Sequence, residues 1–367
     1  MPTPEALPLH GYDFVELWVG NAKQAAHYYR TAFGFTPVAY AGPETGVRDR
    51  ASHVLAQGEI RIVLTSGLTA DHEVARHHAR HGDGVHDVAF RVPDAIAAYE
   101  TALARGAKPH LAPDRRTDEH GEVVVAAVET YGDTVHSLIE RDAYDGPHLP
   151  GYVAAGGRGH GVGLRAIDHV VGNVPAGQME RWTAYYEQVM GLSQFRHFSD
   201  EEIATADTSL ASKVLWDDQG RIKLPINEPG DGPKRSQIEE FLDAYAGAGV
   251  QHLALETSDI IGTVRAMRQR GVGFLDVPAE YYDQLPARVG DVAEPWEELA
   301  ELGILVDRDG AGYLLQIFTE PVQDRPTMFY EIIQREGATG FGTGNFTALF
   351  EAIERAQARR GNLERPR

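Results

Sequence analysis

The stretch Gly247-Ala-Gly-Val-Gln-His-Leu-Ala-Leu255 marks the point where a glycine-ended helical pattern turns into an apolar strand. His252 interrupts the apolar pattern of that strand. A strand side chain that faces a core is normally apolar, so an imidazole there must be hydrogen-bonded or must bind something. Taken alone, His252 is better explained as a hydrogen-bonded core histidine.

Two further polar residues interrupt apolar, strand-like segments in the same way. His169 lies in Ala166-Ile-Asp-His-Val-Val171, and Glu331 lies in Met328-Phe-Tyr-Glu-Ile-Ile333. Two neutral imidazoles and one carboxylate match the facial ligand set of non-haem ferrous iron, which leaves one face of the metal open. Ligand type alone also allows zinc or Mn²⁺, and the long spacings carry no local signature.

Length and composition predict a globular protein of two ordinary domains. The chain has 367 residues, of which 43% are hydrophobic and 24% are charged. The net charge of −20 argues against nucleic acid or an anionic membrane as a partner. No apolar run approaches membrane-spanning length and the first ten residues lack a signal-peptide pattern, so we expect a cytoplasmic protein. Because cysteine is absent, any metal must be held by His, Asp, Glu or backbone oxygen.

The sequence repeats itself over most of its length. Each copy begins with a strand, a loop, an amphipathic helix and a glycine stop, and continues with further strand patterns. The matching segments are 14–34 with 169–191, 51–64 with 211–224, and 82–90 with 247–255. We therefore expect an N-terminal domain over residues 1–150, a linker over 151–163 that holds six glycines, and a C-terminal domain over 164–367.

The two copies differ at the candidate metal ligands. In this alignment Phe14 takes the place of His169, and Asp87 takes the place of His252. Only the second copy therefore has a complete ligand set. We expect a structural N-terminal half and a catalytic C-terminal half.

The C-terminal segment predicts an amphipathic helix over residues 345–360. Its apolar residues follow the i, i+3, i+4, i+7 spacing and are Phe346, Leu349, Phe350 and Ile353. The helix either packs against a sheet or forms a lid over the site. Gly340, Gly342 and Gly344 would supply flexible backbone for a lid.

Each half divides further into two strand-helix-strand units, which resembles the vicinal oxygen chelate superfamily. Six motifs, in this order, also resemble the 4-hydroxyphenylpyruvate dioxygenase family within it. They are Leu224-Pro-Ile-Asn-Glu-Pro229, Ser236-Gln-Ile238, Gly247-Ala-Gly-Val-Gln-His252, Leu315-Gln-Ile-Phe-Thr319, Tyr330-Glu-Ile-Ile-Gln-Arg335 and Gly340-Phe-Gly-Thr-Gly-Asn-Phe346. The resemblance implies an α+β fold of four βαβββ modules in two repeated halves, whose curved sheets cup a metal, with a C-terminal lid helix.

The resemblance also implies the site residues. Fe(II) is expected on His169, His252 and Glu331. The substrate pocket is expected to be lined by Ser212, Pro225, Asn227, Gln237, Gln251, Gln316, Phe318, Phe329, Phe341, Asn345 and Phe346. These residue types suit a phenol, because amides and hydroxyls both donate and accept hydrogen bonds and phenylalanines form walls for an aromatic ring.

The activity implied by this resemblance is oxidation of an aromatic 2-oxo acid by O₂. A family member converts 4-hydroxyphenylpyruvate to homogentisate and CO₂, a step of tyrosine breakdown, and works as a homo-oligomer, a dimer or a tetramer. One alternative is 4-hydroxymandelate synthase, which hydroxylates the side chain; another is a non-enzymatic ligand-binding member of the superfamily. The runs Pro225–Asn227 and Phe341–Phe346 resemble the ring-hydroxylating enzymes, so homogentisate is the expected product.

The remaining histidines are expected to be structural or exposed. His72, His77, His78 and His81 crowd a predicted helix whose counterpart in the second half is ordinary. This favours a solvated helix face over a second metal site. His148 and His160, beside and within the linker, are also expected to be exposed. No phosphate-binding glycine loop opens a helix after a strand, so a nucleotide cofactor is not expected.

Overall fold

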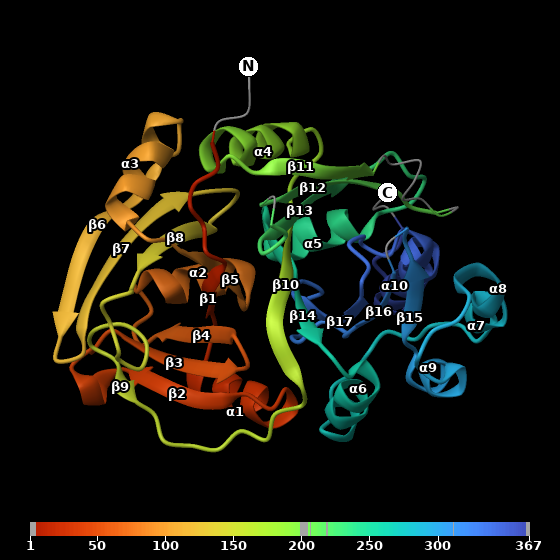
Figure 1. Cartoon of the computed structure of the whole chain (residues 1–367), viewed down its shortest axis with the longest axis horizontal. Helices are drawn as coiled ribbons and strands as arrows, with labels where there is room; N and C mark the ends of the chain where they lie inside the picture. The colour runs from red at the N-terminus through yellow and green to blue at the C-terminus, as the bar shows by residue number, and fades with distance from the viewer. Residues whose placement is uncertain (1–4, 199–204, 206, 218, 311, 365–367) are drawn as a thin grey trace.

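The structure is a computed structural model and describes residues 5–198, 205, 207–217, 219–310 and 312–364. Two curved sheets lie side by side, one built from each half of the chain (Figure 1). The first and second halves occupy opposite sides of the molecule. The α+β class and the two-half organisation predicted from the sequence are confirmed.

The first half builds a nine-stranded sheet with the last strand supplied from the expected linker. Its elements are β1 (Tyr12–Trp18), α1 (Ala22–Ala32), β2 (Thr36–Ala41), η1 (Pro43–Thr45), β3 (Arg50–Gln57), β4 (Ile60–Gly67), α2 (Glu73–His81), β5 (Gly84–Arg91), α3 (Ala95–Ala104), β6 (Pro109–Asp118), β7 (Gly121–Glu129), β8 (Val135–Glu140) and β9 (Val153–Ala154). The short β9 pairs with the edge strand β2, so the glycine-rich segment is partly ordered against the first sheet.

The second half builds an eight-stranded sheet. Its elements are β10 (Leu164–Asn173), α4 (Met179–Tyr185), the π turn η2 (Tyr186–Met190), β11 (Ser193–Phe198), β12 (Leu210–Trp216), β13 (Lys223–Pro229), α5 (Gln237–Tyr245), β14 (Gly249–Thr257), α6 (Ile260–Gln269), α7 (Glu280–Asp283), α8 (Leu285–Val289), α9 (Trp296–Leu302), β15 (Leu305–Arg308), β16 (Tyr313–Phe318), β17 (Phe329–Glu336), η3 (Thr343–Asn345) and α10 (Phe346–Arg360). The helices α7 to α9 form an insertion where the first half has only a short connection between α3 and β6.

The strand orders show that the halves repeat one topology. The first sheet runs β6-β7-β8-β5-β1-β4-β3-β2, followed by β9. The second runs β15-β16-β17-β14-β10-β13-β12-β11 in the same direction. Each strand of the second sheet therefore has a counterpart in the first.

The strand register confirms the alignment of the two copies. Phe14 lies opposite Ala89, as His169 lies opposite Ala254. Asp87 lies opposite Val135, as His252 lies opposite Phe329. By the same register, Ser137 stands at the position that corresponds to Glu331.

Contacts between the halves are exchanged in a nearly twofold manner. The hydroxyl of Tyr330 on β17 donates to that of Tyr29 on α1 at 2.9 Å. In the reciprocal contact, His136 on β8 lies 2.8 Å from the hydroxyl of Tyr186, which follows α4. Because these residues correspond in the two copies, the halves pack as a pseudo-dimer within one chain.

Of the six histidines expected to be exposed, three are buried, His72 and His78 are partly buried, and one is exposed. His77 and His81 are buried, since α2 packs against Tyr245 of the second half. His148 is buried against Phe14 and Tyr152, whereas His160 is exposed as expected.

Among the described residues, none of the helices has the length and apolar character needed to cross a membrane.

Candidate metal and substrate site

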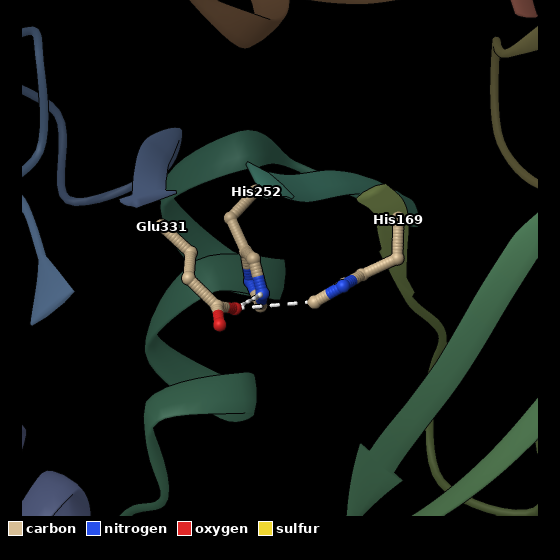
Figure 2. A group of neighbouring side chains, drawn as sticks. All are labelled: His169, His252 and Glu331. Atoms are coloured by element: carbon tan, nitrogen blue, oxygen red, sulfur yellow. Dashed lines mark ion pairs between the residues drawn. The ribbon is translucent and has the colours of Figure 1, made fainter. Parts of the chain in front are cut away.

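Three buried side chains from three neighbouring strands converge inside the second sheet. His169 comes from β10, His252 from β14 and Glu331 from β17, and one ligand atom of each lies within 4.8 Å of the others. Glu331 Oε2 is 3.1 Å from His169 Nε2 and 3.6 Å from His252 Nε2. Figure 2 shows the three side chains pointing toward one common region. Among the described residues, this is the one group with the geometry to hold a metal ion.

The strand register explains why the three side chains meet. The strand β14 lies between β10 and β17, and its Ala254 is opposite both His169 and Glu331. Residues opposite one another share a face of the sheet, and so do residues two apart on one strand. His252 therefore points to the same face, and the small Ala254 leaves room between the three ligands.

Each histidine is oriented by the residue that precedes it. The Nδ1 of His169 lies 2.7 Å from Asp168 Oδ1, and the Nδ1 of His252 lies 3.1 Å from Gln251 Oε1. Because a carboxylate and an amide oxygen only accept, both Nδ1 atoms must carry the proton. Both Nε2 atoms then face Glu331, and each can offer its lone pair to a metal bound between them.

The electrostatics of the site favour a deprotonated carboxylate. Burial would raise the pKa of Glu331, but the adjacent His169 and His252 lower it to about 2. Burial lowers the pKa of His252 and outweighs the influence of Glu331. Burial also acts to lower the pKa of His169, yet Glu331 and Asp168 together raise it. A cation placed between the three groups would replace these mutual contacts.

A cavity opens beside the triad. It is lined by His169, Val171, Leu210, Ser212, Val214, Pro225, Asn227, Gln237, Gln251, His252, Gln316, Phe318, Phe329, Glu331, Phe341, Phe346, Leu349, Phe350 and Ile353. Its mostly apolar wall with a few polar groups is typical of small-molecule sites. The triad is part of the wall of this chamber, together with several aromatic side chains.

Comparisons with known proteins give the same assignment for the whole chain. Residues 4–148 match the family described as hydroxyphenylpyruvate dioxygenase, HPPD, N-terminal, and residues 166–317 match the glyoxalase/bleomycin resistance protein/dioxygenase superfamily. The 4-hydroxyphenylpyruvate dioxygenase of Yarrowia lipolytica is 45% identical over 96% of this chain and 93% of its own length. That of Dictyostelium discoideum is 47% identical over 97% of this chain and 100% of its own. The chain belongs to the 4-hydroxyphenylpyruvate dioxygenase family.

Solved structures agree with the fold and add one related activity. A triple mutant of 4-hydroxymandelate synthase from Streptomyces coelicolor has a TM-score of 0.87 and 36% identity, covering 96% of this chain and 100% of that one. A fusion of a xylose isomerase-like TIM barrel with a 4-hydroxyphenylpyruvate dioxygenase has a TM-score of 0.70 and 26% identity, covering 96% of this chain and 53% of that one. This chain is therefore an enzyme of the vicinal oxygen chelate fold.

Ten of the eleven expected pocket residues line the cavity; Asn345 does not. Asn345 is fully buried, and its Oδ1 accepts hydrogen bonds from Tyr281 at 2.6 Å and Arg288 at 3.0 Å. It holds the start of α10 against the α7–α8 insertion instead of facing the chamber. The neighbouring Gly342 has φ of +73°, and a Cβ there would overlap the side-chain oxygen of Gln316. Only glycine lets this loop approach the pocket so closely.

Six lining residues were not among those expected, and all are apolar. Val171 and Val214 lie two residues beyond His169 and Ser212 on the same strand faces, so strand periodicity alone would have found them. Leu349, Phe350 and Ile353 come from the apolar face of α10, for which the sequence allows either packing or a lid. Leu210 is likewise two residues before Ser212 on β12.

The polar groups of the chamber lie on its walls in two sets. Ser212 and Asn227 are opposite one another on β12 and β13. Gln251 Nε2 lies 3.5 Å from Gln237 Oε1 on the other wall. The Oε1 of Gln316 is buried and has no hydrogen-bond partner among the described residues. A buried amide oxygen without a partner is costly, so it marks a place where a ligand donor fits.

Proposed function

We propose that this chain is an Fe(II)-dependent dioxygenase that converts 4-hydroxyphenylpyruvate and O₂ to homogentisate and CO₂. The observation that carries the proposal is the buried His/His/Glu triad in the wall of a cavity lined by aromatic side chains. It occurs in a chain that is 45% identical, over nearly its full length, to proteins named 4-hydroxyphenylpyruvate dioxygenase. The second half would carry the chemistry, and the first half would be structural.

The donor set fits ferrous iron. Two neutral imidazoles and one carboxylate leave low net charge and an open face on the metal, where a bidentate oxygen ligand and O₂ have room. No cysteine is present to favour a thiolate site. Iron bound by His169, His252 and Glu331 would supply the activation of O₂ and the oxidation of the substrate.

The residues of the chamber then have distinct tasks toward the substrate. The keto acid end would lie at the triad, since two adjacent oxygens chelate a metal better than a phenol does. The aromatic ring would lie among Phe318, Phe341 and Phe346, whose rings form the walls. The phenol O–H would donate to a side-chain amide oxygen, with the partnerless Oε1 of Gln316 as the first candidate.

Exclusion of water is the other task of the chamber. Leu349, Phe350 and Ile353 of α10 close one side with apolar surface. A reactive oxidising centre that is shielded from bulk water loses fewer turnovers to side reactions. We therefore propose that α10 acts as a lid as well as a packing element.

The related activity, 4-hydroxymandelate formation, differs only in which carbon is hydroxylated. The structural likeness to a 4-hydroxymandelate synthase makes this the second candidate function. Pro225, Asn227 and Phe346 all line the cavity, and they belong to the two runs that resemble the ring-hydroxylating enzymes. They would hold the ring toward the metal, so we expect homogentisate.

The test is one reaction with three readouts. The purified protein should contain one iron per chain after loading with Fe(II), consume O₂ on addition of 4-hydroxyphenylpyruvate, and release homogentisate identified by mass spectrometry. Release of mainly 4-hydroxymandelate would leave the fold and the metal site in place but would replace the proposed product. A second stoichiometric metal held by residues before Gly151 would contradict the structural role of the first half.

We further propose that the chain works in the cytoplasm as a homo-oligomer, either a dimer or a tetramer. The absence of cysteine agrees with a chain that does not depend on disulfides. Light scattering coupled to size-exclusion chromatography measures the molar mass directly, and a monomer of 40.2 kDa would contradict the oligomer.

A further inference from the structure

A buried carboxylate lies directly behind the first candidate metal ligand. Asp168 is 6% exposed and accepts a hydrogen bond from His169 Nδ1 at 2.7 Å. Its oxygens also accept from Arg335, through Nε at 2.7 Å and Nη2 at 2.9 Å, and from Lys223 Nζ at 3.0 Å. A two-pronged arginine contact fixes the orientation of a carboxylate as well as its charge. Asp168 is therefore held in place before it orients the histidine.

The other arm of Arg335 reaches the loop that enters the pocket. Its Nη1 donates to the carbonyl oxygen of Gly340 at 2.7 Å. The next residue, Phe341, lines the cavity, and its ring lies edge-on to His169 with 5.1 Å between the centroids. The guanidinium of Arg335 thus contacts both Asp168, which orients His169, and the backbone of the loop that positions the ring of Phe341.

The first half contains a copy of this arrangement without a metal ligand. Asp13 precedes Phe14, as Asp168 precedes His169, and Arg141 corresponds to Arg335 in the register of the two sheets. Asp13 Oδ1 lies 2.7 Å from Arg141 Nη2, and both side chains are buried. Arg141 Nη1 donates to the carbonyl oxygen of His148 at 2.8 Å.

Comparison of the two aspartate–arginine pairs shows which contacts both halves share and which contact occurs only at the candidate metal site. In both halves an arginine pairs with a buried aspartate and holds the segment that follows the sheet. In both halves that segment also brings a ring to 5.1 Å from the residue at the first ligand position. Only in the second half does the aspartate touch an imidazole, since the side chain of Phe14 has no N–H to donate.

We propose, on the basis of the function proposed above, that Asp168 and Arg335 are positioning residues of the active site. Asp168 fixes the tautomer and the direction of His169 so that Nε2 faces the metal. Arg335 ties that orientation to the loop of Phe341, so the metal ligand and the substrate wall are set by one buried cluster. Removal of a hydrogen-bond partner of a metal-ligating histidine typically lowers the metal affinity by about 10- to 100-fold.

The test compares Asp168→Asn with the matched variant Asp13→Asn. Each removes one negative charge from an equivalent buried aspartate–arginine pair, but only Asp168 contacts a candidate metal ligand. We expect Asp168→Asn to weaken Co(II) and Fe(II) binding about 10- to 100-fold in a chelator-competition titration. It should also alter the visible absorption spectrum of the Co(II) protein. Asp13→Asn should leave the metal affinity and the spectrum unchanged, although both variants lower the melting temperature.

Arg335→Lys tests the second link, and it still applies where Asp168→Asn does not fold. Lysine keeps a positive charge beside Asp168 but lacks the fork that also reaches Gly340. We expect KM for 4-hydroxyphenylpyruvate to rise severalfold while the Co(II) affinity stays within about threefold of the wild type. An unchanged KM would remove the loop from the proposal.

The outcomes distinguish this inference from the proposed function. A wild-type protein that neither binds a divalent metal nor consumes O₂ with 4-hydroxyphenylpyruvate would overturn the proposed function itself. A wild-type protein that does both, with equal metal affinity and spectrum in Asp168→Asn and Asp13→Asn, would overturn only the positioning role. In that case the cluster would be a fold-stabilising ion pair in both halves.

Discussion

The two halves share one sheet topology but use its curved face in opposite ways. In the second half, His169, His252 and Glu331 direct ligand atoms into a cavity. In the first half the same three positions hold Phe14, Asp87 and Ser137. Asp87 accepts from the backbone N–H of Ser137 at 2.9 Å and from its hydroxyl at 2.5 Å, so its oxygens are occupied within the sheet.

In the first half, side chains of the same half fill the concave side of the sheet. The segment after β8 brings Tyr144 and Leu149 into one apolar cluster with Phe14, and Tyr152 packs against that cluster. His148 stacks edge-on against Phe14 in the same region. In the second half, the chain after β17 instead passes through a glycine-rich loop into α10, which covers the cup without filling it. Three positions and one following segment thus distinguish the first half from the half that holds the candidate active site.

The largest expected effect comes from removing a ligand in one half and its counterpart in the other. His252→Ala should weaken Fe(II) binding by more than about 100-fold and reduce turnover to background. This effect exceeds that of removing a hydrogen-bond partner of a ligand, because a ligand itself is lost. The matched variant Asp87→Asn should retain full iron content and activity. Metal analysis and O₂ uptake on both proteins check the pair. Undiminished iron and activity in His252→Ala would remove that residue from the site.

The next effect concerns the element that only the second half possesses. If α10 closes the chamber, deleting residues from Asn345 onward should lower turnover by about 100-fold, as expected when a substrate is misplaced by roughly 1 Å. Iron binding should fall far less, because none of the triad lies on α10. The measurements are kcat/KM and iron content, with circular dichroism as the control for folding. Equal catalytic efficiency in a folded, truncated protein would leave α10 with a packing role alone.

A smaller effect is expected on the choice of product. Phe346 is one of the aromatic walls of the cavity, and its ring lies near Phe350 of the same helix. Phe346→Ile should loosen the substrate ring by about 0.5–1.5 kcal/mol, which corresponds to about a 2- to 10-fold change in the partition between ring and side-chain hydroxylation. Chromatography of the products should show 4-hydroxymandelate rising at the expense of homogentisate. An unchanged ratio would place the decision elsewhere, with Asn227 as the next candidate.

The repeated fold could be predicted because it depends on local periodicity. An imidazole or carboxylate that breaks an apolar strand is visible residue by residue, whereas joining His169, His252 and Glu331 into one ligand set also needed the resemblance to the family. The burial of His77 and His81 was missed because it depends on the other half. His81 lies against the backbone oxygen of Tyr245 and 2.8 Å from Asp133. The position of Asn345 outside the cavity lining could not be predicted for a similar reason, since its partners Tyr281 and Arg288 belong to an insertion without a counterpart in the first half.

The smallest expected effect is on the free energy of unfolding. It comes from Asp87 in the first half, whose place in the second half is taken by His252. Burial, opposed by hydrogen bonds from Ser137, raises the pKa of Asp87 to about 7. The folded state then binds this proton more tightly than the unfolded chain, whose aspartates titrate near pH 4. Stability contributed by the protonated group is therefore fully present below about pH 4 and is lost as the pH rises through 7.

Asp87→Asn removes this titration while keeping the contacts to Ser137, because an amide can accept from the backbone N–H and donate to the hydroxyl oxygen. Between pH 6 and pH 8 the wild type should lose about 1 kcal/mol of unfolding free energy relative to the variant. Urea unfolding of both proteins at the two pH values measures the difference. A wild type that is less stable than the variant by the same amount at both pH values would mean that Asp87 is already ionised at pH 6. The first half would then carry a buried charge at the position where the second half is expected to hold a metal.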